Sequence, residues 1–215
     1  MADPIKNLRN LLPVLPSCLL IAATGALGAD SAVDQSYVAR TGEPVLRQSV
    51  LLDESVERVW DLYTTAKGLQ SWAAPNAEVD LRIGGTIRSN FKVGAGIGAP
   101  GTIETDIISL IPEAEIVLRD DLVHLLTMGG LFKWLDLYPQ AFLTELETNG
   151  DDLLTTVRFE SVADNQTRLT LFSYGYDEGT EWNRIYEENK KSNLWFLNNL
   201  SKRVEEGPID WPKEE

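Results

Sequence analysis

One uninterrupted stretch near the C-terminus, residues 181–205, constrains the fold more than any other feature. It contains no Pro or Gly, and Gly207-Pro208 follows it, which is a common way for a helix to end. The pattern predicts one long helix, whose apolar face recurs every three or four residues at Trp182, Tyr186, Asn189, Asn193, Phe196, Leu200 and Val204. That face is widened by Ile185, Trp195 and Leu197. Such a helix needs a large apolar partner surface, which the strand-rich middle of the chain can supply.

The N-terminal segment has the pattern of an export signal. Lys6 and Arg9 precede an uncharged run at residues 11–29, and small residues occupy the two positions that a signal peptidase reads, Ala26 and Gly28. We expect residues 1–28 to be a signal peptide that is cleaved after Gly28, with a periplasmic or secreted product. Three alternatives stay open: a membrane anchor, which the Pro and Gly residues of the run disfavour, a lipoprotein signal at Cys18, and a wrongly assigned start.

Cysteine count and charge narrow the chemistry of the mature chain. Cys18 is the only cysteine, so cleavage would leave none for thiol catalysis or metal binding. The net charge of -14 disfavours nucleic acid and anionic membrane surfaces, which bind through Lys and Arg. We expect residues 29–42 to be a flexible lead-in and residues 43–211 to be one domain, without stable membrane insertion after cleavage. Nothing in the sequence indicates the oligomeric state.

The middle of the chain has the alternation of an antiparallel sheet. A short helix is expected after Ser55 as its N-cap, ending at Gly68, with a second turn at residues 69–72. Residues 93–101 are rich in glycine and are expected to form a loop. Strand patterns cover residues 44–52, 77–91, 101–111, 115–119, 141–147, 153–162 and 168–176.

Two of these segments carry finer expectations. Within residues 77–91, Val79, Leu81 and Ile83 are expected on a buried face, and Gly84-Gly85 indicates a bulge or tight bend. Residues 120–139 have the spacing of two short amphipathic helices. This insertion is either a lid over a cavity, a part of the core or a subunit interface.

Several motifs occur in an order that is similar to a known family. They are Val50-Leu51 with Asp53, residues 55–60, Gly68-Leu69 with Trp72, residues 79–85, the long helix, and residues 206–208 with Trp211. Together they resemble an SRPBCC (START-like) domain of the type found in activators of heat-shock-protein ATPase and their bacterial homologues, within a superfamily that includes polyketide cyclase-like proteins. The resemblance covers roughly residues 45–211. It implies an α+β helix-grip fold, with an antiparallel sheet curved around one long C-terminal helix and, in many members, an apolar cavity between them.

Few residues are candidates for catalysis. His124 is the only histidine, so a histidine-based triad or a two-histidine metal site is impossible. His124 and Tyr186 are candidates for an acid or base, and a structural or exposed histidine is the alternative for His124. The pairs Asp120-Asp121 and Asp151-Asp152 lie at predicted turns and are interpreted as solvated. No metal or cofactor site is indicated.

Polar and aromatic residues on apolar faces predict a pocket for a small molecule. The alternative is that sheet backbone or water satisfies them. Ser109 and Ser173 are also expected to point inward, and Trp60 and Phe159 to form further walls. The predicted ligand-binding residues are Trp72, Ser89, Phe91, Thr105, Trp134, Trp182, Tyr186, Asn189 and Asn193.

Three functions are consistent with these observations. The first is an exported protein that binds a small apolar molecule, lipid-like or aromatic, between sheet and helix. The second is a cofactor-independent enzyme of the cyclase or dehydratase type that uses the same cavity. The third is a chaperone-interaction module, which export would disfavour.

Overall fold

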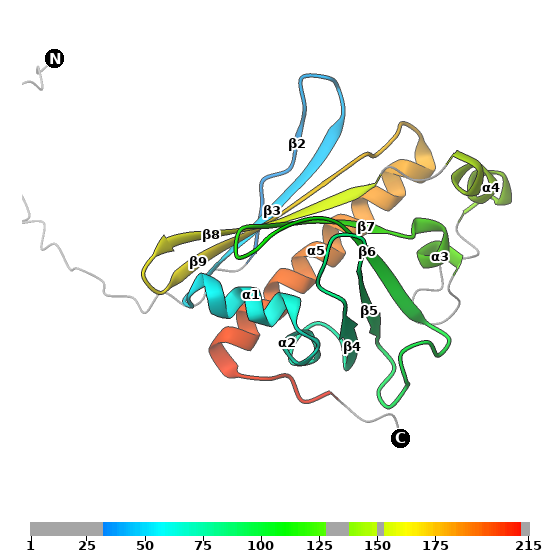
Figure 1. Cartoon of the computed structure of the whole chain (residues 1–215). Helices are drawn as coiled ribbons and strands as arrows, with labels where there is room; N and C mark the ends of the chain where they lie inside the picture. The colour runs from blue at the N-terminus through cyan, green and yellow to red at the C-terminus, as the bar shows by residue number, and fades with distance from the viewer. Residues whose placement is uncertain (1–31, 128–137, 150–152, 212–215) are drawn as a thin grey trace, which may run out of the picture.

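The computed structural model describes residues 32–127, 138–149 and 153–211, and the nine strands in this part of the chain form one antiparallel sheet (Figure 1). The strands are β1 (Val33–Asp34), β2 (Tyr37–Val38), β3 (Pro44–Leu52), β4 (Asn76–Val79), β5 (Thr86–Asn90), β6 (Thr102–Ile111), β7 (Glu115–Asp120), β8 (Leu154–Ala163) and β9 (Gln166–Tyr174). The helices are α1 (Val56–Thr64), α2 (Ala66–Gln70), α3 (Leu122–Thr127), α4 (Gln140–Asn149) and α5 (Thr180–Glu206). The sheet bends around α5, which confirms the predicted helix-grip fold.

The strand order explains how the chain surrounds α5. The order is β1-β3-β9-β8-β7-β6-β5-β4, with β2 also paired to β3. The first long strand therefore lies beside the last, and Leu46 on β3 faces Ser173 on β9. Since β3 and β4 lie toward opposite ends of the sheet, α1 and α2 must cross between them. These two helices and α5 then share one face of the sheet.

The long helix α5 buries four residues fully against the rest of the domain: Ile185, Leu197, Leu200 and Ser201. Leu197 and Leu200 pack in a core cluster with the sheet, α1 and α2, whereas Ile185 belongs to a second cluster with α3 and α4. Trp195 was expected on the buried stripe but is 46% exposed, because it lies outside the arc that faces the sheet and packs edge-on against Phe196. None of the described helices combines the length and hydropathy that a membrane span needs.

The first two helices differ slightly from the expectation. Ser55 caps α1 as predicted, since its Oγ accepts a hydrogen bond from the backbone N–H of Arg58. Gly68 does not end a helix, however, but lies inside α2. A Cβ at Gly68 would approach the carbonyl oxygen of Asp61 to 2.3 Å, so the glycine allows α2 to pack closely on α1.

Residues 77–91 form two strands rather than one. β4 and β5 pair antiparallel, with Glu78 opposite Arg88, and the chain between them turns at Gly84, whose φ is +75°. Leu81 and Ile83 lie in this turn and are 38% and 64% exposed, so their expected burial is wrong. The apolar alternation continues past the end of β4, whereas the expected tight bend at the glycine pair is confirmed.

A bulge in β6 moves one predicted inward residue. The register between β6 and β7 shifts between Ile107 and Ser109, so that Ile107 pairs with Leu118 and Ser109 with Val117. Because the extra residue reverses the alternation, Ser109 leaves the inner face and Leu110 takes its place in the core.

Residues 141–147 are helical rather than extended. Phe142, Leu143 and Leu146 are buried in α4, while Thr144 and Glu145 are exposed, which is the spacing of a helix with one apolar face. The strand expected at residues 141–147 is therefore wrong, since α4 takes its place. Within the proposed insertion at residues 120–139, α3 is described and residues 128–137 lie outside the described part.

Candidate functional site

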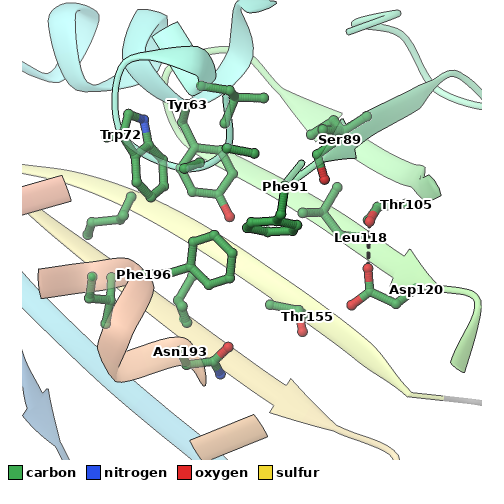
Figure 2. A pocket seen from close by; sticks show the side chains of 17 residues that line it. Tyr63, Trp72, Ser89, Phe91, Thr105, Leu118, Asp120, Thr155, Asn193 and Phe196 are labelled. Atoms are coloured by element: carbon green, nitrogen blue, oxygen red, sulfur yellow. Dashed lines mark hydrogen bonds between the residues drawn. The ribbon is translucent and has the colours of Figure 1, made fainter. Parts of the chain in front are cut away.

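A cavity lies between the sheet and α5, in two adjoining chambers of about 180 Å³ and about 220 Å³. Figure 2 shows the first chamber, whose walls come from α1, α2, strands β5 to β9 and α5. The second chamber extends toward α3, where Leu122 and Leu126 line it. Both chambers share the residues at their junction: Ser89, Phe91, Thr105, Asp120, Thr155, Asn193 and Phe196.

Aromatic rings form the apolar walls of the first chamber. Phe196 on α5 meets Trp72 edge-on at 6.1 Å between ring centroids and Phe91 at 6.4 Å. Tyr63 on α1 packs against Trp72 at 5.7 Å, and in Figure 2 its hydroxyl points into the chamber. The indole N–H of Trp72 donates to the carbonyl oxygen of Leu62, which fixes the ring in the wall. The chamber therefore presents an apolar surface of fixed shape.

Asp120 is the only acidic side chain among the described residues that line either chamber. It is the last residue of β7, opposite Thr105 on β6, and the Thr105 hydroxyl donates to Asp120 Oδ1 at 2.6 Å. The residue is half buried, and its carboxyl group borders the cavity instead of the outer surface of the sheet. This burial raises the pKa of the Asp120 carboxyl, and the hydrogen bond from Thr105 opposes part of the rise.

A second group of polar side chains connects the sheet to α5. The hydroxyls of Thr155 on β8 and Ser173 on β9 lie 3.0 Å apart, and Asn193 Nδ2 donates to Ser173 Oγ at 3.3 Å. One turn earlier on α5, Asn189 Nδ2 donates to the Tyr176 hydroxyl at 3.2 Å. Burial raises the pKa of Tyr176 to about 12, so this hydroxyl stays neutral. Ser173 on β9 and Tyr176 just after β9 thus each accept one hydrogen bond from a side-chain amide of α5, and both amide side chains also line the cavity.

The structure brings together most of the predicted pocket residues. The cavity lining includes Trp72, Ser89, Phe91, Thr105, Asn189 and Asn193, and also the expected inward Ser173.

Other predicted residues lie elsewhere. Trp182 packs on Phe142 of α4 at 5.9 Å, and Tyr186 packs on Tyr176 at 5.1 Å, so both rings pack against the second core cluster. Neither of the two lines the described chambers. Trp134 lies outside the described residues, and the backbone of His124 is described within α3 but its side chain is not.

Two expected wall residues belong to the core instead of the cavity lining. The rings of Trp60 and Phe159 pack edge-on against each other at 5.0 Å, and both lie in the main apolar cluster. In the described ranges, no group of three or more His, Cys, Asp or Glu side chains is placed to hold a metal ion.

The sequence reading missed Asp120, Tyr63 and Thr155, and its interpretation of Asp120 as a solvated turn residue is wrong. A signal for Asp120 was present. Ile116 and Leu118 are buried on the inner face of β7, and the two-residue period of a strand places Asp120 on that same face. The interpretation of Asp120 as a turn residue ended the predicted strand at Arg119, one residue before the last residue of β7.

The fold and cavity define a domain of the SRPBCC class. Residues 53–202 match the family model described as Activator of Hsp90 ATPase homolog 1-like protein, and this chain belongs to that family. No curated protein sequence matches the chain.

Solved structures with the same fold have little sequence in common with this chain. The Aha1 dimer from Colwellia psychrerythraea is 18% identical with a TM-score of 0.52, over 76% of this chain and 97% of that one. DynU16, from the dynemicin biosynthetic locus, is 16% identical with a TM-score of 0.53, over 78% of this chain and 51% of that one. CalU16 from Micromonospora echinospora is 16% identical with a TM-score of 0.51, over 83% of this chain and 85% of that one. At such identities these similarities show the fold alone.

Proposed function

We propose that this protein binds a small, mostly apolar molecule in the cavity between the sheet and α5. One observation carries the proposal: aromatic walls from four separate segments of the chain surround a space that also contains a few convergent polar groups. Small-molecule sites have this composition, in which apolar walls provide affinity and a few polar groups fix orientation. Chambers of about 180 and 220 Å³ suit one ring system in each.

A probe that is neutral and apolar tests the proposal directly. We expect N-phenyl-1-naphthylamine to bind with a rise in fluorescence, and Ser89→Phe to weaken binding about tenfold or more, since the new ring fills the junction of the chambers. Ser161→Phe is the matched control, because Ser161 is exposed near the end of β8. Circular dichroism verifies that both variants fold. Equal affinity of wild type and Ser89→Phe would refute the proposed site.

We also propose that the protein is exported, which the N-terminal sequence alone supports. Lys6, Arg9 and the apolar run that follows have the order of a signal peptide. The expected result is an intact mass that begins at Ala29 when the full chain is expressed in its own host. A mass that retains residues 1–28 would contradict export with cleavage, and recovery with the membrane fraction would indicate the anchored alternative.

A second candidate function is an enzyme of the cyclase or dehydratase type. Asp120 favours it, because a carboxyl with a raised pKa beside an apolar binding space is suited to proton transfer. In that case the bound molecule should change mass on incubation with wild type but not with Asp120→Asn. An unchanged molecule in both samples supports the binding protein.

A further inference from the structure

Asp120 offers the cavity an unused hydrogen-bond acceptor. Thr105 occupies Oδ1, and none of the described residues donates to Oδ2. Figure 2 shows the carboxyl group directed away from its strand, toward the space between Phe91 and Thr155. An occupant of either chamber can therefore reach Oδ2, since both chambers share this residue.

No described side chain that lines the chambers balances the charge of Asp120. The polar lining consists of hydroxyls and amides, without Lys or Arg. Arg119, the preceding residue of β7, points to the opposite face and pairs with Asp106 at 2.9 Å. The other described titratable groups that face Asp120 are the hydroxyls of Tyr63 and Tyr176, and burial raises the pKa of both. A carboxylate in this position gains most from a cation that the ligand brings.

The other uncommitted polar groups also suit a donor-rich ligand. Asn193 uses its Nδ2 to donate to Ser173, and no described residue donates to its Oδ1. The hydroxyls of Tyr63 and Ser89 can donate or accept and therefore adapt to the ligand. The rings of Tyr63, Phe91 and Phe196 add electron-rich faces, which attract organic cations. Acceptors and aromatic faces thus meet at one junction.

We infer that the cavity selects an apolar amine, whose ammonium group pairs with Asp120 while its hydrocarbon part fills the aromatic chamber. This inference rests on the proposed binding function and names its ligand class. It excludes fatty acids and other anionic amphiphiles, which would place two negative charges together in a buried site. The chain's net charge of -14 favours cations at long range as well.

Three probes of one shape separate charge from apolar contact: 1-naphthylmethylamine, 1-naphthalenemethanol and 1-naphthoic acid. By titration calorimetry at neutral pH, wild type should bind the amine about tenfold tighter than the alcohol, a difference of about 1.4 kcal/mol. The acid should bind most weakly of the three. Asp120→Asn should remove the preference for the amine.

The control is Asp121→Asn, which removes the same charge from the exposed adjacent residue and should keep the preference. This control matters because the acidic surface attracts any cation. The inference is overturned if the alcohol or the acid binds as tightly as the amine, if Asp120→Asn keeps the preference, or if none of the three binds while N-phenyl-1-naphthylamine does. The proposed function itself fails if none of the three naphthalene probes binds and if Ser89→Phe binds N-phenyl-1-naphthylamine as tightly as wild type does.

Discussion

Leu200→Ala should lower the free energy of unfolding by about 2–5 kcal/mol, the usual range for deleting a fully buried leucine side chain. Leu200 is 0% exposed and lies in the core cluster where α5 meets the sheet, α1 and α2. The loss combines the transfer of apolar atoms with the cavity that remains, since elements on several sides cannot all collapse into it. Urea unfolding followed by circular dichroism measures the difference.

The same substitution at an exposed position is the control for Leu200. Leu81 lies in the turn between β4 and β5 and is 38% exposed, so Leu81→Ala should change stability by only about 0.5 kcal/mol. If Leu200→Ala had an equally small effect, α5 would not be central to the core. The helix-grip account of this domain would then be wrong.

Asp120→Asn should stabilise the empty protein at neutral pH by about 1–3 kcal/mol, the typical cost of a buried polar atom without a hydrogen-bond partner, because the charged carboxylate has a described donor at Oδ1 alone. Burial raises the pKa of the Asp120 carboxyl in the folded state above its value in the unfolded chain. The folded protein therefore keeps this proton to higher pH, and stability falls as the pH rises through the raised pKa. An asparagine can keep the contact to Thr105 but carries no charge.

The pH dependence distinguishes this cause from a change in packing. The difference between Asp120→Asn and wild type should be largest at neutral pH and shrink toward zero below about pH 3, where the carboxyl is protonated in both states. Asp121→Asn, at the exposed neighbour, should show no such trend. The claim that the Asp120 charge destabilises the empty protein would be contradicted by either of two results. One is an Asp120→Asn variant that is less stable than wild type at neutral pH, and the other is a stability difference that does not vary with pH.

Periodicity predicted the elements that are long or strongly patterned. The helical spacing at residues 181–205 gave α5 to within a residue at each end, and the alternation at residues 44–52 coincides with β3. Short runs were less reliable. The seven residues at 141–147 fit both the helical period and the strand period, so their apolar pattern does not distinguish α4 from a strand. The β6 bulge leaves no local pattern, since it depends on the partner strand β7.

The candidate site was predictable where it lies on elements with a clear face. Asn189 and Asn193 stand out as amides on an apolar helix stripe, and both line the cavity. The sequence does not indicate that Tyr63 borders the cavity, because its hydroxyl enters the chamber only where α1 crosses this part of the sheet. The pairing of Asp120 with Thr105 requires the β6–β7 register. The spacing of residues in the sequence does not predict that register, because residues 105 and 120 come together only when β6 and β7 pair.

Native mass spectrometry of the protein, purified gently from its own host, tests the central claim most directly. The claim is that the cavity between sheet and α5 holds one small molecule. The account predicts wild type with one bound species on the order of a few hundred daltons, which basic extraction releases as an amine, and a Ser89→Phe variant without it. A wild type that carries no small molecule, and that binds N-phenyl-1-naphthylamine no better than Ser89→Phe does, would contradict the account.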